Sequence, residues 1–134
     1  MMEISASLWR AYQAIVFFTD KPITFERFVV ITACNPRSIK ASEEINYQRN
    51  NQLREQINNE NFIQLEVGDA EKLWVEPSFC VEISLQNGLK LAQEFDQNAL
   101  YYVENGQLWL ISCCDERLNL GPFDQKVRKG KIDN

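Results

Sequence analysis

Residues 28–36 read Phe-Val-Val-Ile-Thr-Ala-Cys-Asn-Pro, and this stretch decides the fold that the sequence predicts. Apolar side chains fall on both faces of an extended chain from Phe28 to Cys34, which is typical of a central strand buried on both sides. The strand should end at Asn35-Pro36, because proline has no N–H for the ladder and restricts the residue before it. A sheet that is covered on both faces is therefore expected around this strand.

The segments on either side of this strand alternate between strand and helix patterns. Periodicity and turn residues predict helices over residues 5–12, 42–59 and 87–95, and strands over residues 14–18, 62–67, 78–84, 99–104 and 107–113. The longest helix begins at Ser42, whose hydroxyl can cap the first turn. Asn105-Gly106 is typical of a type I′ turn between two strands.

The order of these elements predicts the fold class. Without the first and last strands it is β-α-β-β-α-β, which is the ferredoxin-like arrangement. We therefore predict an α+β fold with a ferredoxin-like core, in which a mostly antiparallel sheet of about five or six strands carries two helices on one face. A length of 134 residues suits a single α+β domain over residues 1–134. Its core is expected at residues 12–113, and residues 115–134 are expected to form a C-terminal tail.

The charge balance limits the partners that this protein can have. Acidic residues outnumber basic ones by 19 to 14, so the net charge is −5. This charge opposes a nucleic-acid or anionic membrane partner, because phosphate groups are bound by basic patches. The basic cluster of Lys126, Arg128, Lys129 and Lys131 is expected in the solvated tail. The N-terminal stretch carries Glu3 and lacks a long apolar run, so no signal peptide or membrane span is expected.

The absence of histidine from the sequence excludes several chemistries. Ser-His-Asp and Cys-His nucleophilic sites are ruled out, as are histidine metal ligands. The four cysteines, Cys34, Cys80, Cys113 and Cys114, form no CxxC pair, and the adjacent two should point to opposite faces of a strand. We interpret them as thiols in a reducing compartment. A cytoplasmic protein without a cofactor or a metal is expected.

Polar residues stand where the predicted strands end. The topology makes strands 78–84 and 99–104 the antiparallel neighbours of the central strand, so Asn35, Ser78 and Asn98 should share one rim of the sheet. The long helix starts at the same rim. Its sheet-facing stripe carries Asn46 and Asn50, where apolar residues would be usual.

Buried amide groups need partners, because an unpaired one costs about 1–3 kcal/mol. The partners of Asn46 and Asn50 can be neighbouring groups of the chain, in which case the cluster is a structural network. They can instead be a pocket and its waters, in which case the cluster is a ligand recess. The sequence leaves both alternatives open. It also leaves open whether Trp74, in the loop before Glu76-Pro77, is a core anchor or a lid.

Five short segments have an order and spacing that resemble a known family. They are Ile31-Thr32-Ala33-Cys34-Asn35-Pro36, Ser42 with Asn46, Asn50 and Leu53, Gly68-Asp69, Glu76-Pro77-Ser78-Phe79, and Ala92 with Phe95 and Gln97-Asn98-Ala99. Over residues 12–111 the chain resembles the small bacterial family catalogued as domain of unknown function 3293. Tryptophan is usual in that family where this chain has Cys34, so the resemblance implies no chemistry at this cysteine. It implies no activity, but it does imply that a set of polar residues acts together: Asn35, Asn46, Glu76, Ser78, Gln97 and Asn98.

The first hypothesis for function is a non-enzymatic binding module. It would take a small polar molecule or a protein partner in a recess lined by amide, hydroxyl and carboxyl groups. The candidate ligand-binding residues are Asn35, Asn46, Asn50, Glu76, Ser78, Gln97 and Asn98. The alternative is an enzyme that uses Glu76 as a general acid or base and Asn35 and Asn98 as polar stabilisers. A raised pKa of Glu76 would favour the enzyme, and a redox role for Cys34 or Cys80 is a third option.

Overall fold

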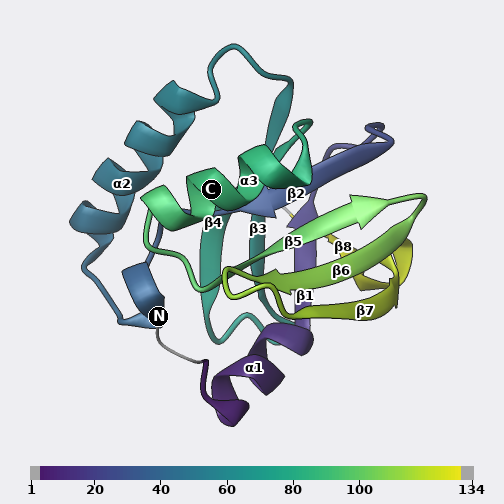
Figure 1. The fold of residues 1–134 in the computed structure, drawn as a ribbon, viewed down its shortest axis with the longest axis horizontal. Coiled ribbons are helices and arrows are strands. Elements are labelled where there is room, and N and C mark those ends of the chain that lie inside the picture. Colours follow the sequence, from purple (N-terminus) through teal and green to yellow (C-terminus); the bar gives the residue numbers. More distant parts are fainter. Residues whose placement is uncertain (1–3, 131–134) are drawn as a thin grey trace.

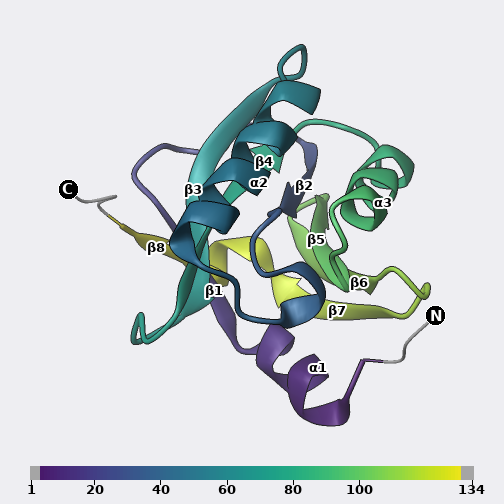
Figure 2. The same ribbon diagram turned by 90° about the vertical axis from the view of Figure 1, so that its left-hand side faces the viewer.

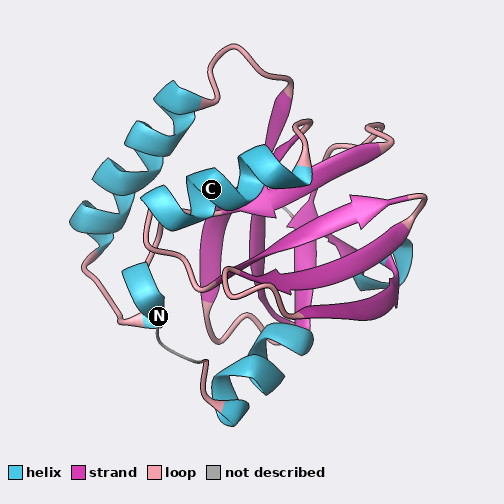
Figure 3. Ribbon diagram, in the orientation of Figure 1, coloured by secondary structure: helices cyan, strands magenta, loops and turns pink. Residues whose placement is uncertain are grey.

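The computed structural model describes residues 4–130 and has helices and strands in mixed order (Figure 1; Figure 3). Glu3 and Lys131, which the sequence analysis considered, lie outside the described residues. The elements are α1 (Ala6–Gln13), β1 (Ile15–Thr19), β2 (Arg27–Ile31), the 3₁₀ turn η1 (Pro36–Ser38), α2 (Glu43–Gln56), β3 (Phe62–Asp69), β4 (Val75–Val81), α3 (Leu85–Glu94), β5 (Ala99–Glu104), β6 (Gln107–Ser112), β7 (Arg117–Pro122), the 3₁₀ turn η2 (Phe123–Lys126) and β8 (Val127–Lys129).

The strands form one mixed sheet in the order β7-β6-β5-β2-β4-β3-β1-β8. All neighbours are antiparallel except β1 and β8, which run parallel. The sheet curls into a half-barrel (Figure 1). The curl brings Phe17 of β1 against Tyr101 of β5, with ring centroids 5.3 Å apart, although three strands separate β1 from β5.

The predicted ferredoxin-like class is wrong. The structure has three α-helices and an eight-stranded mixed sheet in its described part, whereas a sheet of five or six mostly antiparallel strands with two helices was expected. The predicted neighbours of the central strand are confirmed, since β2 pairs antiparallel with both β4 and β5. The class is wrong because the strands β7 and β8, which were not predicted, extend the sheet together with β1 into a half-barrel, and α1 lies at its base (Figure 1).

Two apolar clusters bury the two faces of the sheet, as the pattern at residues 28–34 predicted. The outer cluster lies under α2 and α3 and includes Val29, Leu53 and Phe79. The inner cluster fills the hollow of the half-barrel and includes Phe28 and Phe123. Val29 and Phe28 are adjacent on β2 and belong to different clusters, because successive side chains of a strand point to opposite faces.

The expectation of a C-terminal tail is also wrong for the described residues beyond position 115. Residues 117–122 pair with β6, and residues 127–129 pair with β1 at the opposite edge of the sheet. Between them, η2 places the Phe123 ring 5.0 Å from Phe17 and 5.3 Å from Phe28. Lys126 donates to the backbone oxygen of Gln13, 2.8 Å away, so it is part of the folded domain.

Serine caps fix where the three helices begin. Ser5, Ser42 and Ser84 each accept a hydrogen bond from the backbone N–H three residues later, which confirms the cap that was predicted for the long helix. Leu53 and Ile57 at the end of α2 pack into the outer cluster. Within residues 4–130, no helix has the length and apolar character that crossing a membrane requires.

Strand β4 already includes Glu76 and Pro77, whereas the sequence predicted that this strand starts at residue 78. Pro77 pairs with Glu66 of β3, while β2 on the other side has already ended at Ile31. The Pro77 carbonyl points to that vacated side, where it accepts from Thr32 at 2.7 Å and from Asn50 at 3.0 Å. The N–H and C=O of a strand residue point to the same side, so the position of the missing N–H of Pro77 also faces this side. Because β2 has already ended there, the proline costs no ladder hydrogen bond.

Candidate functional site

The segment after β2 is held by side chains of α2. Asn50 accepts from the backbone N–H of Ala33 at 2.8 Å and donates to the Pro77 oxygen at 3.0 Å. One turn earlier, Asn46 accepts from the N–H of Asn35 at 2.8 Å and donates to its side-chain oxygen at 2.9 Å. Both amides therefore replace ladder bonds that the chain loses where β2 ends.

Asn35 is the centre of this asparagine network, which we define as Asn35, Asn46 and Asn50. Its backbone is left-handed, with φ 48°, a conformation that asparagine tolerates better than most residues. Its Oδ1 accepts from Asn46 and from the N–H of Ala41 at 2.9 Å, and its Nδ2 donates to Glu76 at 2.7 Å. The side chain thus has partners at both ends, and it ties the β2 end to β4 and to the start of α2.

Among the described residues, Glu76 is the carboxyl group that accepts a hydrogen bond from the asparagine network. Its Oε2 accepts the hydrogen bond from Asn35, and within residues 4–130 no other group donates to the Glu76 side chain. Burial raises the pKa of Glu76, and the hydrogen bond from Asn35 only partly opposes this effect. The group is therefore easier to protonate than an exposed glutamate.

This raised pKa gives a first testable prediction. A carboxyl group whose pKa is higher in the folded state stabilises the fold below its unfolded pKa, and this contribution is lost as the pH rises through the folded pKa. The stability of the unmodified protein should therefore rise relative to E76Q as the pH falls, because glutamine cannot titrate. Urea unfolding of both proteins between acid and neutral pH measures the difference, with Q48A at an exposed position of α2 as a neutral control. A difference that does not change with pH would contradict the prediction.

The remaining predicted residues lie around the network rather than in it. Gln97 donates to the backbone oxygen of Cys34 at 3.1 Å and so supports the same segment from behind. Asn98 donates to the hydroxyls of Tyr12 and Ser38, at 3.2 and 3.4 Å. Ser78 is buried and donates to the Glu76 backbone oxygen at 3.1 Å within its own strand. The structure thus brings Asn35, Asn46, Asn50 and Glu76 together, with Gln97 adjacent, whereas Asn98 and Ser78 have other partners.

A groove of about 780 Å³ runs between α2 and the neighbouring strands β3 and β4. Figure 2 shows α2 lying across these two strands. The asparagine network and Glu76 contribute to the lining of the groove. Six further polar residues that line the groove were not predicted from the sequence: Glu43, Tyr47, Asn51, Arg54, Gln64 and Glu66.

Arg54 has a fixed position in the wall of this groove. Its guanidinium donates to Gln64 at 2.7 Å and lies over the rings of Phe62 and Phe79, 5.9 and 5.7 Å from their centroids. These contacts stiffen the side chain and place one positive charge among the acidic residues of the groove. A signal for Arg54 was present in the sequence, because it follows Asn46 and Asn50 at helical spacing.

The surroundings of Cys34 and Cys80 do not support a redox role, and the exposure of Trp74 does not support a role as a core anchor. Burial raises the pKa of the Cys34 thiol, and burial likewise raises the pKa of Cys80, so neither cysteine is an activated nucleophile. Trp74 is 42% exposed in the turn between β3 and β4, so it is not a core anchor. Its backbone N–H is held by the Asp69 carboxylate at 3.0 Å.

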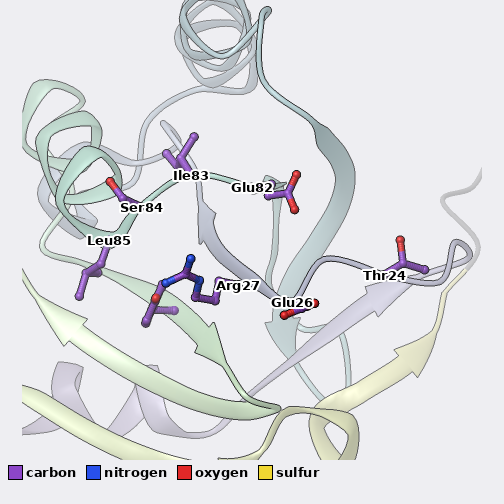
Figure 4. Close-up of a pocket in the computed structure, with 8 residues that line it drawn as sticks. Thr24, Glu26, Arg27, Glu82, Ile83, Ser84 and Leu85 are labelled. Carbon is purple, nitrogen blue, oxygen red and sulfur yellow. The ribbon is translucent and has the colours of Figure 1, made fainter.

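A second hollow, of about 640 Å³, lies beside the start of α3 (Figure 4). Figure 4 shows the Arg27 side chain extending toward Ser84 and Leu85, with Glu26 next to it in the chain and Glu82 on the segment that leads to α3. Arg27 and the two glutamates are exposed, and none of the predicted site residues lines this hollow. The groove along α2 is therefore the better candidate, because it combines a half-buried carboxyl group with a fixed set of amides.

The comparison with protein families finds the same family that the segments of the sequence resemble. The model of the family described as Protein of unknown function (DUF3293) matches residues 31–100, about half of the chain. This range contains the asparagine network, Glu76, Ser78, Gln97 and Asn98. No curated protein and no solved structure matches the chain. The chain therefore belongs to the family described as Protein of unknown function (DUF3293).

Proposed function

We propose that this protein is a binding module that takes a small polar molecule in the groove between α2 and β3–β4. The observation that carries the proposal is the groove itself. Its volume of about 780 Å³ lies in the range of pockets for small ligands. Amide, carboxyl, guanidinium and phenol groups from three parts of the chain line it, and such groups orient a polar ligand.

The asparagine network supports this proposal by keeping one wall of the groove rigid. Its amides are bonded to Ala33, Asn35 and Pro77, so the wall is already in place before a ligand arrives. A preformed site loses less conformational entropy on binding than a flexible one. In this proposal the network shapes the site, and the direct contacts come from exposed groups such as Tyr47, which is 70% exposed.

The charges of the groove favour a neutral or cationic ligand over an anionic one. Glu43, Glu66 and Glu76 line the groove, whereas Arg54 is the lining residue with positive charge among those described. Arg54 already donates to Gln64. We further propose that the protein works in the cytoplasm, which its thiol-form cysteines Cys34 and Cys80 support.

A thermal-shift screen against polar metabolites tests the binding proposal. A ligand of the groove should raise the melting temperature of the unmodified protein. Y47A should weaken its binding by about tenfold or more, which corresponds to roughly 1.4 kcal/mol. Q48A changes the next, exposed residue of α2, outside the groove lining, and should bind normally. A ligand that binds Y47A and the unmodified protein equally would contradict the proposed site, and a screen without any ligand would favour a protein partner.

An enzyme is the second candidate, and the raised pKa of Glu76 is the observation that favours it. A carboxyl group that holds its proton at higher pH is a better general acid near neutrality. In this candidate Asn35 would position Glu76, because its Nδ2 donates to Glu76 and its Oδ1 already accepts two hydrogen bonds. Once a ligand is known, E76Q separates the candidates: a binding module keeps its affinity, and an enzyme keeps binding but loses turnover.

A further inference from the structure

Two adjacent thiols occupy the turn between β6 and β7. The sequence pattern predicted Cys113 and Cys114 on opposite faces of a strand, which is wrong because β6 ends at Ser112. The buried Ser112 hydroxyl accepts from the N–H groups of Cys114 and Glu116, at 3.2 and 2.9 Å, and so holds the base of the turn. Both cysteines are therefore carried on a short, fixed loop.

Both cysteines also line the same hollow, of about 180 Å³, together with Arg37 and Gln97. The Cys113 thiol lies 3.2 Å from the backbone oxygen of Gln97, to which it donates, and is half-buried. Cys114 is exposed. One cysteine is thus exposed to solvent, and the second is half-buried in the same hollow.

Their adjacency limits the kind of bond that they can form. Consecutive Cα atoms are about 3.8 Å apart across a trans peptide bond, whereas disulfides usually join Cα atoms roughly 4.4–6.8 Å apart. A Cys113–Cys114 disulfide would therefore be strained and easily reduced. Strained or exposed disulfides are the labile ones, suited to reversible modification rather than to structural support.

We propose that Cys113 and Cys114 form a reversible modification site that reacts with small-molecule disulfides and closes to an intramolecular disulfide. In the first step the exposed Cys114 sulfur attacks the small disulfide, forms a mixed disulfide and releases one thiol. In the second step Cys113 attacks the Cys114 sulfur and releases the second thiol. In total, two protein thiols are oxidised to one disulfide, and one small disulfide is reduced to two thiols that carry the two protons.

The environments of the two sulfurs agree with this order. Burial, and then the neighbouring Cys114, raise the pKa of the Cys113 thiol, so Cys113 is the poorer first nucleophile and acts as the resolving group. Closure removes the thiol hydrogen that Cys113 donates to Gln97. The side chain of Gln97 donates to the backbone oxygen of Cys34 and so helps to hold that segment. Because closure removes a hydrogen bond to Gln97, the oxidised protein should melt at a lower temperature than the reduced one.

Oxidised glutathione and mass spectrometry test the proposal in the full chain. Trypsin separates the cysteines, because the peptide of residues 91–117 contains Cys113 and Cys114, while Cys34 and Cys80 lie in two other peptides. After treatment, the 91–117 peptide should be two hydrogens lighter and carry no glutathione, and dithiothreitol should restore it. The peptides with Cys34 and Cys80 serve as internal controls and should remain unmodified.

Two single variants show whether the closure follows the proposed steps. C113A should stop at a glutathione adduct on Cys114, because no resolving thiol is present. C114A should react at least tenfold more slowly than the unmodified protein, because the exposed nucleophile is missing. A stable glutathione adduct on the unmodified protein, a disulfide between two chains, or no reaction at residues 91–117 would each overturn the proposal.

Discussion

Phe123→Ala is expected to lower the free energy of unfolding by about 3–5 kcal/mol, the usual cost of truncating a buried aromatic ring. Phe123 is 7% exposed and packs against the rings of Phe17 and Phe28 inside the half-barrel. Truncation leaves a cavity between strands that are not neighbours in the sheet, so the surrounding chain cannot easily close it. Urea denaturation followed by tryptophan fluorescence measures the change.

Asp124→Ala is the matched control for Phe123→Ala. Asp124 is the next residue of η2 and is exposed, so its truncation should change the stability by no more than about 0.5 kcal/mol. If Phe123→Ala cost as little as Asp124→Ala, the C-terminal segment would not be part of the domain core. The comparison therefore tests the main correction that the structure makes to the predicted fold.

Asn50→Leu should lower the free energy of unfolding by about 1–3 kcal/mol, because it leaves the buried N–H of Ala33 without its acceptor and removes one hydrogen bond to the Pro77 oxygen. The N–H of Ala33 loses its acceptor completely, while the Pro77 oxygen keeps the hydrogen bond from Thr32. Leucine has the same number of side-chain heavy atoms and the same branch at Cγ, so no cavity is left and the loss is one of hydrogen bonding. Amide hydrogen exchange should show faster exchange at Ala33 in the variant.

Gln52→Ala controls for changes in α2 itself, since Gln52 is exposed on the same helix. Its effect should stay within about 0.5 kcal/mol. An Asn50→Leu variant that is as stable as the unmodified protein would mean that the amide contributes no net stability. In that case the structural account of the asparagine network would fail.

The sequence predicted the centre of the sheet and missed its edges for a physical reason. The apolar run at residues 28–34 reports burial on both faces directly, and β2 does have Phe28 and Val29 in opposite clusters. The curl of the sheet depends instead on contacts such as Phe17 with Tyr101, between strands far apart in the chain. No local pattern encodes a contact of this kind.

The local sequence pattern indicates the C-terminal strands β7 and β8 only weakly. Leu118 and Leu120 alternate with polar residues, as in a half-buried strand, and both are half-buried in β7. Gly121-Pro122 favoured a loop, and β8 is only three residues long. The parallel pairing of β8 with β1 joins residues at opposite ends of the chain, so nothing in either segment alone predicts it.

In the candidate site, too, the residues that follow a local pattern could be predicted, whereas contacts between distant segments could not. Asn46 and Asn50 could be predicted because polar residues stood on a helical stripe that should have been apolar, and the structure pairs both of them with backbone. Asn98 was expected beside Asn35, but Tyr12 and Ser38 bind it instead. The position of Tyr12 depends on how α1 docks below the half-barrel, which its own sequence does not determine.

The parallel pairing of β1 with β8 also has a consequence for synthesis on the ribosome. The β1 segment emerges early, but the strand that covers its outer edge is translated only after more than half of the domain. Until then β1 presents unpaired backbone groups that could pair with another nascent chain. Slower translation lengthens this interval, so the yield of folded product should depend on chaperones that shield nascent strands.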